Sequence, residues 1–213
     1  YAYHAYAVRF TANTSVCCEF AHRRYFYMKT QENSLKFTNE LKLFGNVKVL
    51  AVTALLAAAS FILALLAKSI FGPGPLRLTF ENLPIFLTSF LFGPTVGGVT
   101  ALCADLISCL YSGMAPIPLI TVGAVLVGVI SGTMFKYVLP KINVKFSAPI
   151  AVATAHLIGS ALVKTFALYP WYGNVVFFRI PIYIGISVIE SLALVFLLKN
   201  KSFMNQIGKV IKK

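Results

Sequence analysis

The chain has 213 residues, of which 58% are hydrophobic and only 12% are charged. Soluble domains carry about a quarter charged residues, so the composition excludes an ordinary soluble globular protein. The net charge of +13 comes from cations that lie between and beyond the apolar runs rather than along one face, which argues against a nucleic-acid partner. We therefore expect an all-α protein embedded in a lipid bilayer.

The chain opens with a polar N-terminal tail, residues 1–45. Residues 1–27 show no steady hydrophobic period and no signal-peptide core, and the first residue is Tyr rather than Met. A more ordinary polar segment follows Met28. We expect residues 1–27 to lie upstream of the true initiation site or to be disordered, and a functional tail with a vicinal cysteine pair is the alternative.

Six apolar stretches follow, at about 47–67, 78–93, 95–112, 117–138, 148–168 and 175–198. Several approach the ~20 residues that an α-helix needs to cross the hydrocarbon core. Residues 46–199 are therefore expected to form a domain of six transmembrane helices, followed by a basic tail at 200–213. The second and third stretches are short and joined by Gly93-Pro94, which predicts a tilted or incompletely spanning pair.

The distribution of Lys and Arg indicates the orientation of these helices. With a cytoplasmic N-terminus, the lysines of both tails and of the loop around 136–145 all lie inside, so both termini are expected in the cytoplasm. Four cations remain on the outer side: Lys68, Arg77, Lys164 and Arg179. For the two lysines, snorkelling toward the headgroups explains their position at least as well as a role in ligand binding does. For the arginines we favour ligand binding, because a planar guanidinium binds carboxylates in a bidentate manner.

The start of the second helix carries the first group of candidate binding residues. Arg77 is followed one turn later by Glu81 and Asn82, which offer acceptors and an amide donor suited to the edge of a heterocycle. A simple Arg77–Glu81 salt bridge is the alternative.

The sixth helix carries the second group. Its polar residues recur at spacings of 4, 4 and 3 and share one face, which must turn inward in lipid: Arg179, Tyr183, Ser187 and Glu190. Just before this helix, Trp171 and Tyr172 mark the outer boundary. They form either an interfacial aromatic belt or a stacking lid over a planar ligand.

Two further polar residues are expected inside the membrane. A carboxylate such as Asp105 costs at least ~2.5–3.5 kcal/mol there, so it should face the interior, paired with Arg179, Lys164 or a hydroxyl, or contact substrate. His156 is equally open to a structural or a ligand-binding role. Neither another His nor a Cys lies at metal-ligand spacing from His156, so we expect no metal site.

Small residues predict two packing faces. Ala124, Gly128 and Gly132 recur every four positions, which favours close packing within the bundle. On the first helix, Ala54 and Ala58 form one small-residue pair and Ser60 and Ala64 another, a smooth surface suited to an external partner. The chain has no phosphate-binding loop and no nucleophile elbow, so we expect neither ATP hydrolysis nor a cofactor in this chain.

Five segments carry a family resemblance, in the right order: LRLTFENLPI (76–85), FGPTVGG (92–98), ADLIS (104–108), PLITVGA (118–124) and RIPIYI (179–184). Over about 46–199 the chain resembles the folate-family substrate-binding S-component of energy-coupling factor (ECF) vitamin transporters. The resemblance implies a subunit in the bacterial cell membrane that binds folate from outside with high affinity. It also implies docking on a membrane coupling protein with two ABC ATPases, which use ATP and Mg, followed by reorientation in the membrane. The family's docking motif maps onto Ala54 and Ala58, and its two arginines map onto Arg77 and Arg179.

Three alternatives stay open. An S-component for another flat vitamin or precursor, riboflavin-like or a deazapurine, would leave one arginine unexplained. A small membrane enzyme would use Asp105, His156 and Glu190, but we expect these three residues at different depths. An assembly protein would use the polar residues only to hold helices together.

Overall fold

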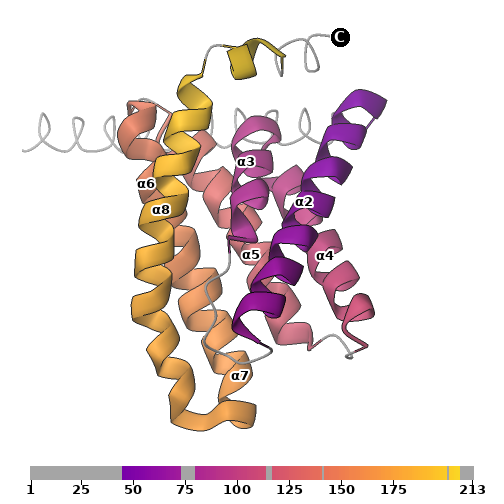
Figure 1. Cartoon of the computed structure of the whole chain (residues 1–213). Coiled ribbons are helices and arrows are strands. Elements are labelled where there is room, and N and C mark those ends of the chain that lie inside the picture. The colour runs from indigo at the N-terminus through magenta and orange to yellow at the C-terminus, as the bar shows by residue number, and fades with distance from the viewer. Residues whose placement is uncertain (1–44, 73–79, 114–116, 141, 201, 207–213) are drawn as a thin grey trace, which may run out of the picture. The chain divides into compact units, whose positions relative to one another are not determined.

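The computed structural model of the chain describes residues 45–72, 80–113, 117–140, 142–200 and 202–206, all within one unit, Glu40–Lys213. These residues form α-helices with short π- and 3₁₀-helical segments, and no strand occurs among them (Figure 1). The all-helical class is confirmed. The predictions for residues 1–44, for Arg77 and for the last seven residues lie outside the described parts.

The first four helices are separated by Gly and Pro residues. They are α2 (Val47–Phe71), α3 (Asn82–Phe92), α4 (Pro94–Tyr111) and α5 (Pro118–Thr133), which the π-helical segment η1 (Met134–Val138) continues. Between α3 and α4, Gly93 has φ 113°, a value that L side chains rarely adopt, and Pro94 starts α4.

The remaining helical segments follow one another almost without a break. They are α6 (Val144–Ala155), the π-helical η2 (His156–Val163), α7 (Lys164–Tyr172), the 3₁₀-helical η3 (Gly173–Phe178) and α8 (Arg179–Lys199). Figure 1 shows the chain turning at η3, so that α8 runs back beside α6 and η2.

Four stretches of the described residues are long and apolar enough to cross a membrane: 47–71, 94–111, 118–138 and 144–199, the last comprising α6 through α8. Each of the six expected stretches contains a helix whose ends differ from the expectation by a few residues. With only 11 residues, α3 is too short to cross alone, as its proline-bounded sequence predicted. Six crossings and cytoplasmic termini stay predictions.

The surface of the described helices suits a lipid environment. Large apolar side chains such as Leu55, Ile184 and Phe196 are mostly exposed. In water such an extensive apolar surface would drive aggregation, whereas a bilayer accommodates it.

The centre of the bundle is α5, which packs against α3, α4, α6, η2 and α7. Its small residues allow this: a Cβ added at Gly128 would lie 2.5 Å from the carbonyl oxygen of Gly97, and one added at Gly132 would lie 2.7 Å from Cα of Pro94. The expected packing face of Ala124, Gly128 and Gly132 is therefore confirmed, since all three are buried and the two glycines contact α4.

Two side-chain hydrogen bonds fix α3 inside the bundle. Ser89 Oγ donates to the carbonyl oxygen of Gly128 on α5 at 2.8 Å, and Ser60 Oγ on α2 donates to the carbonyl oxygen of Glu81 just before α3. Figure 1 shows α3 level with the start of α2 and the end of α8, with α7 and η3 at the opposite end. The first residues of α3 therefore lie in the interior.

Candidate functional site

Buried polar side chains gather where the start of α3 meets η2, α7 and α8. We call this group the polar cluster, and it consists of Glu81, Asn82, His156, Lys164, Arg179, Tyr183 and Glu190. All but Glu81 are buried. In a membrane protein, ionisable groups at such positions mark functional sites more often than in a soluble core, because each is costly to keep there.

The centre of the polar cluster is a pair formed by His156 on η2 and Glu190 on α8. His156 Nε2 and Glu190 Oε2 are 2.6 Å apart, and His156 Nδ1 lies 3.3 Å from Ser160 Oγ. The imidazole also meets the edge of Phe86, with ring centroids 5.1 Å apart. Because Phe86 is one turn beyond Asn82 on α3, this contact joins the pair to the start of α3.

Arg179 and Tyr183 extend the polar cluster along α8. Arg179 Nη2 donates to the hydroxyl of Tyr183 at 2.9 Å, and the guanidinium carbon lies 5.3 Å from the centre of the same ring. The Tyr183 ring in turn lies 5.5 Å from the imidazole of His156, measured between centroids. The inward-facing surface predicted for this helix is confirmed for Arg179, Tyr183 and Glu190, whereas Ser187 is half-buried.

Lys164 connects α7 to the start of α3. Its Nζ lies 3.9 Å from Glu81 Oε1, and its side chain is 7% exposed. Glu190 feels the charges of both Lys164 and Glu81, so the two pairs belong to one site. The snorkelling explanation of Lys164 is therefore wrong: the side chain is buried and packs against α5, where a Cβ added at Gly123 would lie 2.8 Å from Lys164 Cγ. Lys68 donates to Ser108 on α4 and to Ser112, the residue that follows α4.

Five buried side-chain atoms of the described residues have no hydrogen-bond partner, and all lie in or beside the polar cluster. They are Asn82 Oδ1 and Nδ2, Thr165 Oγ1, Arg179 Nε and Glu190 Oε1. Buried polar groups are nearly always paired in native proteins, and an unpaired one costs about 1–3 kcal/mol. These donors and acceptors distinguish the polar cluster from the rest of the described interior.

Asp105 lies outside the polar cluster. Its Oδ2 accepts a hydrogen bond from the hydroxyl of Thr121 at 2.7 Å, so the hydroxyl alternative is the one the structure shows. The expectation that Asp105, His156 and Glu190 lie at different depths is wrong for the last two. His156 lies about three turns beyond the start of α6, and Glu190 lies about two to three turns before the end of α8. Because the two helices are antiparallel, these two ends are neighbours, and the two residues reach the same depth and meet.

The aromatic residues and the small-residue pairs lie at the surface or in the packing. Trp171 is 72% exposed and Tyr172 is 43% exposed, both at the end of α7. Ala54 and Ala58 are exposed on α2. The second pair, Ser60 and Ala64, is buried, so the expectation of a fully outward small-residue surface is wrong for these two.

Sequence reasoning missed Ser160 and Thr165. The signal was present: His156, Ser160 and Lys164 recur every four residues, a spacing that places three polar groups on one helical face.

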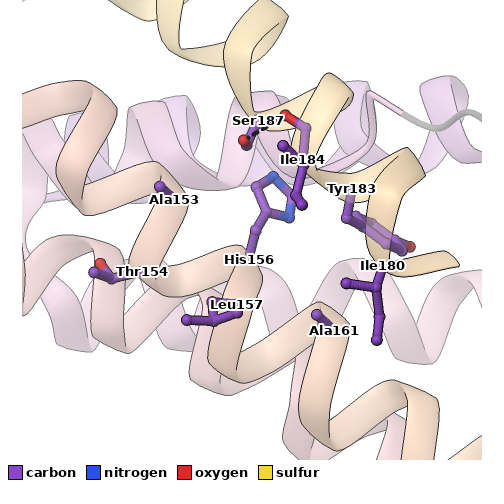
Figure 2. Close-up of a pocket in the computed structure, with 9 residues that line it drawn as sticks. All are labelled: Ala153, Thr154, His156, Leu157, Ala161, Ile180, Tyr183, Ile184 and Ser187. Atoms are coloured by element: carbon purple, nitrogen blue, oxygen red, sulfur yellow. Dashed lines mark hydrogen bonds between the residues drawn. The ribbon is translucent and has the colours of Figure 1, made fainter. Parts of the chain in front are cut away.

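A groove lies beside the polar cluster, between η2 and α8, with a volume of about 260 Å³. Figure 2 shows the imidazole of His156 projecting from η2 into this region, with Tyr183, Ile184 and Ser187 on α8 facing it. Most of the lining is apolar, and we call it the α6–α8 groove. His156 and Tyr183 thus belong both to the groove and to the polar cluster.

Comparison with known proteins gives one match. The model of the family described as "ECF transporter, substrate-specific component" matches residues 48–208, about three quarters of the chain. No curated protein and no solved structure matches the chain.

Proposed function

The chain belongs to the ECF transporter substrate-specific component family, and on that basis we propose that it is the folate-binding subunit of an ECF-type importer. Membership makes it a multi-pass transport subunit of the membrane rather than an enzyme. The proposal adds that it captures folate at the outer face of the cell membrane and docks on a coupling protein with two ABC ATPases.

The observation that carries the proposal is the set of unpaired atoms in the polar cluster. Folate joins a flat pterin, whose edge mixes donors and acceptors, to a glutamate with two carboxylates. The side-chain amide of Asn82 has a donor and an acceptor, both buried and without a partner among the described residues. It is therefore suited to the pterin edge, with Glu81 beside it.

Arg179 is suited to a ligand carboxylate. It is buried, and no carboxylate of the described residues lies within salt-bridge distance of it. A buried cation without a counter-charge is costly, and a bidentate carboxylate is the partner that a guanidinium prefers. A ligand with no carboxylate, such as a riboflavin-like vitamin, would leave Arg179 uncompensated. Arg77, which lies outside the described residues, is proposed as the second anion-binding residue.

The outer aromatic residues and α2 supply the other parts of the proposal. Trp171 and Tyr172 are exposed near the start of α8 and are proposed to stack on the ligand's rings as it binds. Ala54 and Ala58 form an exposed, smooth surface on α2, which we assign to docking on the coupling protein.

A comparison of folate with 6-methylpterin, which keeps the pterin and has no carboxylate, tests the assignment in purified protein. Arg179→Gln should weaken folate binding by about 10- to 150-fold, the equivalent of a hydrogen bond to a charged group, and should leave 6-methylpterin binding nearly unchanged. Asn82→Leu should weaken both ligands equally. Arg179→Lys keeps the charge and controls for the fold. Equal loss of both ligands in Arg179→Gln would overturn the carboxylate assignment.

A further inference from the structure

Two like charges lie together at the ends of α6 and α8. Lys145 is the second residue of α6 and Lys199 the last of α8; both are exposed, and α6 packs against α8 with the start of α6 and the end of α8 at the same end of the bundle (Figure 1). Only three acidic residues follow residue 44, and each is engaged elsewhere: Glu81 with Lys164, Asp105 with Thr121 and Glu190 with His156. No acidic residue of the described chain therefore balances this pair.

The α6–α8 groove runs along the same seam between helices. Its nearest lining residue on α6, Ala153, is eight residues beyond Lys145, about 12 Å at 1.5 Å per residue. Half of the hydrocarbon core measures about 15 Å, so the groove begins at the depth of lipid acyl chains. Leu157 and Ile184 border the groove and are 57% and 62% exposed, which shows that it opens toward the surrounding lipid.

The polar groups that line the groove are already paired within the protein. The hydroxyl of Thr154 donates to backbone carbonyls of its own helix, that of Ser187 donates to the carbonyl of Ile184, and His156 is paired with Glu190. The groove thus presents a hydrocarbon-like surface, in contrast to the polar cluster with its unpaired atoms. A polar vitamin would gain little there, whereas an acyl chain would fit it.

We propose that an anionic phospholipid binds along this seam, with its phosphate between Lys145 and Lys199 and one acyl chain in the α6–α8 groove. A shared phosphate removes the repulsion between the two ammonium groups, and basic sites between transmembrane helices are known to bind lipid head groups. The acyl chain then covers the outer side of the contact between η2 and α8, close to the His156–Glu190 pair. This inference depends on membrane embedding and not on the identity of the transported ligand.

Thermal unfolding of the purified protein in mild detergent tests the site. Phosphatidylglycerol should raise the unfolding midpoint more than phosphatidylcholine with the same acyl chains. Lys145→Gln and Lys199→Gln should each weaken phosphatidylglycerol binding, measured by native mass spectrometry, by about fivefold. Lys48→Gln is the matched control, because Lys48 is an exposed lysine and the second residue of α2, and the start of α2 lies at the same end of the bundle as the end of α8 (Figure 1).

A second variant separates the acyl chain from the head group. Ala153→Phe fills the groove at an exposed position, so it should weaken long-chain phosphatidylglycerol and leave the short-chain dihexanoyl form unaffected. Inorganic phosphate alone should not stabilise the protein. Three results would each overturn the proposal. They are an equal rise of the unfolding midpoint with both head groups, an equal loss of phosphatidylglycerol binding in Lys48→Gln, and full stabilisation by inorganic phosphate.

Discussion

Replacing Gly128 by Ala tests the helix packing that positions the polar cluster. The added Cβ would lie 2.5 Å from the carbonyl oxygen of Gly97, 2.7 Å from its carbonyl carbon and 2.9 Å from the nitrogen of Gly98. Ordinary contact begins at 3.4 Å, so the shortfall is 3.4 − 2.5 = 0.9 Å. All three atoms are backbone, and no flexible side chain can move to relieve the clash. The helices α4 and α5 must therefore separate.

The expected cost follows from this geometry. Overpacking a well-packed interior costs about 1–3 kcal/mol. The carbonyl of Gly128 also accepts the hydrogen bond from Ser89 that holds α3 at 2.8 Å, and weakening that bond adds about 0.5–1.5 kcal/mol. Together they predict a loss of about 2–4 kcal/mol in the free energy of unfolding. Because α3 begins with Asn82, folate affinity should fall as well.

Equilibrium unfolding in mixed detergent measures this loss, and Gly185→Ala is the control. A Cβ added at Gly185 on α8 meets nothing within 4 Å, so this variant should change the free energy of unfolding by less than about 0.5 kcal/mol. If Gly128→Ala proved as stable as the parent protein, the close contact between α4 and α5 would be refuted.

Three other substitutions test separate parts of the account. Glu190→Ala leaves His156 buried without its partner and should lower the free energy of unfolding by about 3–5 kcal/mol. Glu190→Gln should lower it less, and equal losses of stability in the two variants would contradict the pairing of Glu190 with His156. Ala58→Trp should abolish co-purification with the coupling protein and leave folate affinity unchanged, since Ala58 is exposed, whereas Ser60, through which α2 contacts Glu81 of the polar cluster, is buried. Thr121→Val removes the hydroxyl that donates a hydrogen bond to Asp105 and should cost about 1–3 kcal/mol of stability with unaltered ligand affinity; a selective loss of affinity would place Asp105 in the binding site.

The helices were largely predictable because apolar runs are bounded by Gly and Pro. Gly93-Pro94 separates α3 from α4, since Gly93 takes φ 113° and Pro94 lacks an N–H group. The helix lengths were less predictable. The segment from α6 to α7 continues through Pro149 and Pro170, which are tolerated inside it. A proline in a membrane helix can be accommodated by neighbouring helices and by local π-helical turns, which a single sequence does not reveal.

The site was predictable only where one helix carries the pattern. The spacing of Arg179, Tyr183 and Glu190 identified the buried face of α8. The contact between His156 and Glu190 was missed, because it joins two residues that are 34 positions apart on different helices and depends on how each helix is rotated. The direction of Lys164 stayed open between an interior partner and snorkelling for the same reason. Periodicity shows which residues share a face, but it does not show which face meets which neighbour.

Titration of the purified, folded protein with folate by isothermal calorimetry tests the central claim most directly. The account predicts saturable binding with one folate per chain, and competition by reduced folates. Absence of binding by folded protein to folate and to its reduced forms would contradict the folate assignment. Saturable binding of a flat vitamin without carboxylates in its place would also contradict the role given to Arg179.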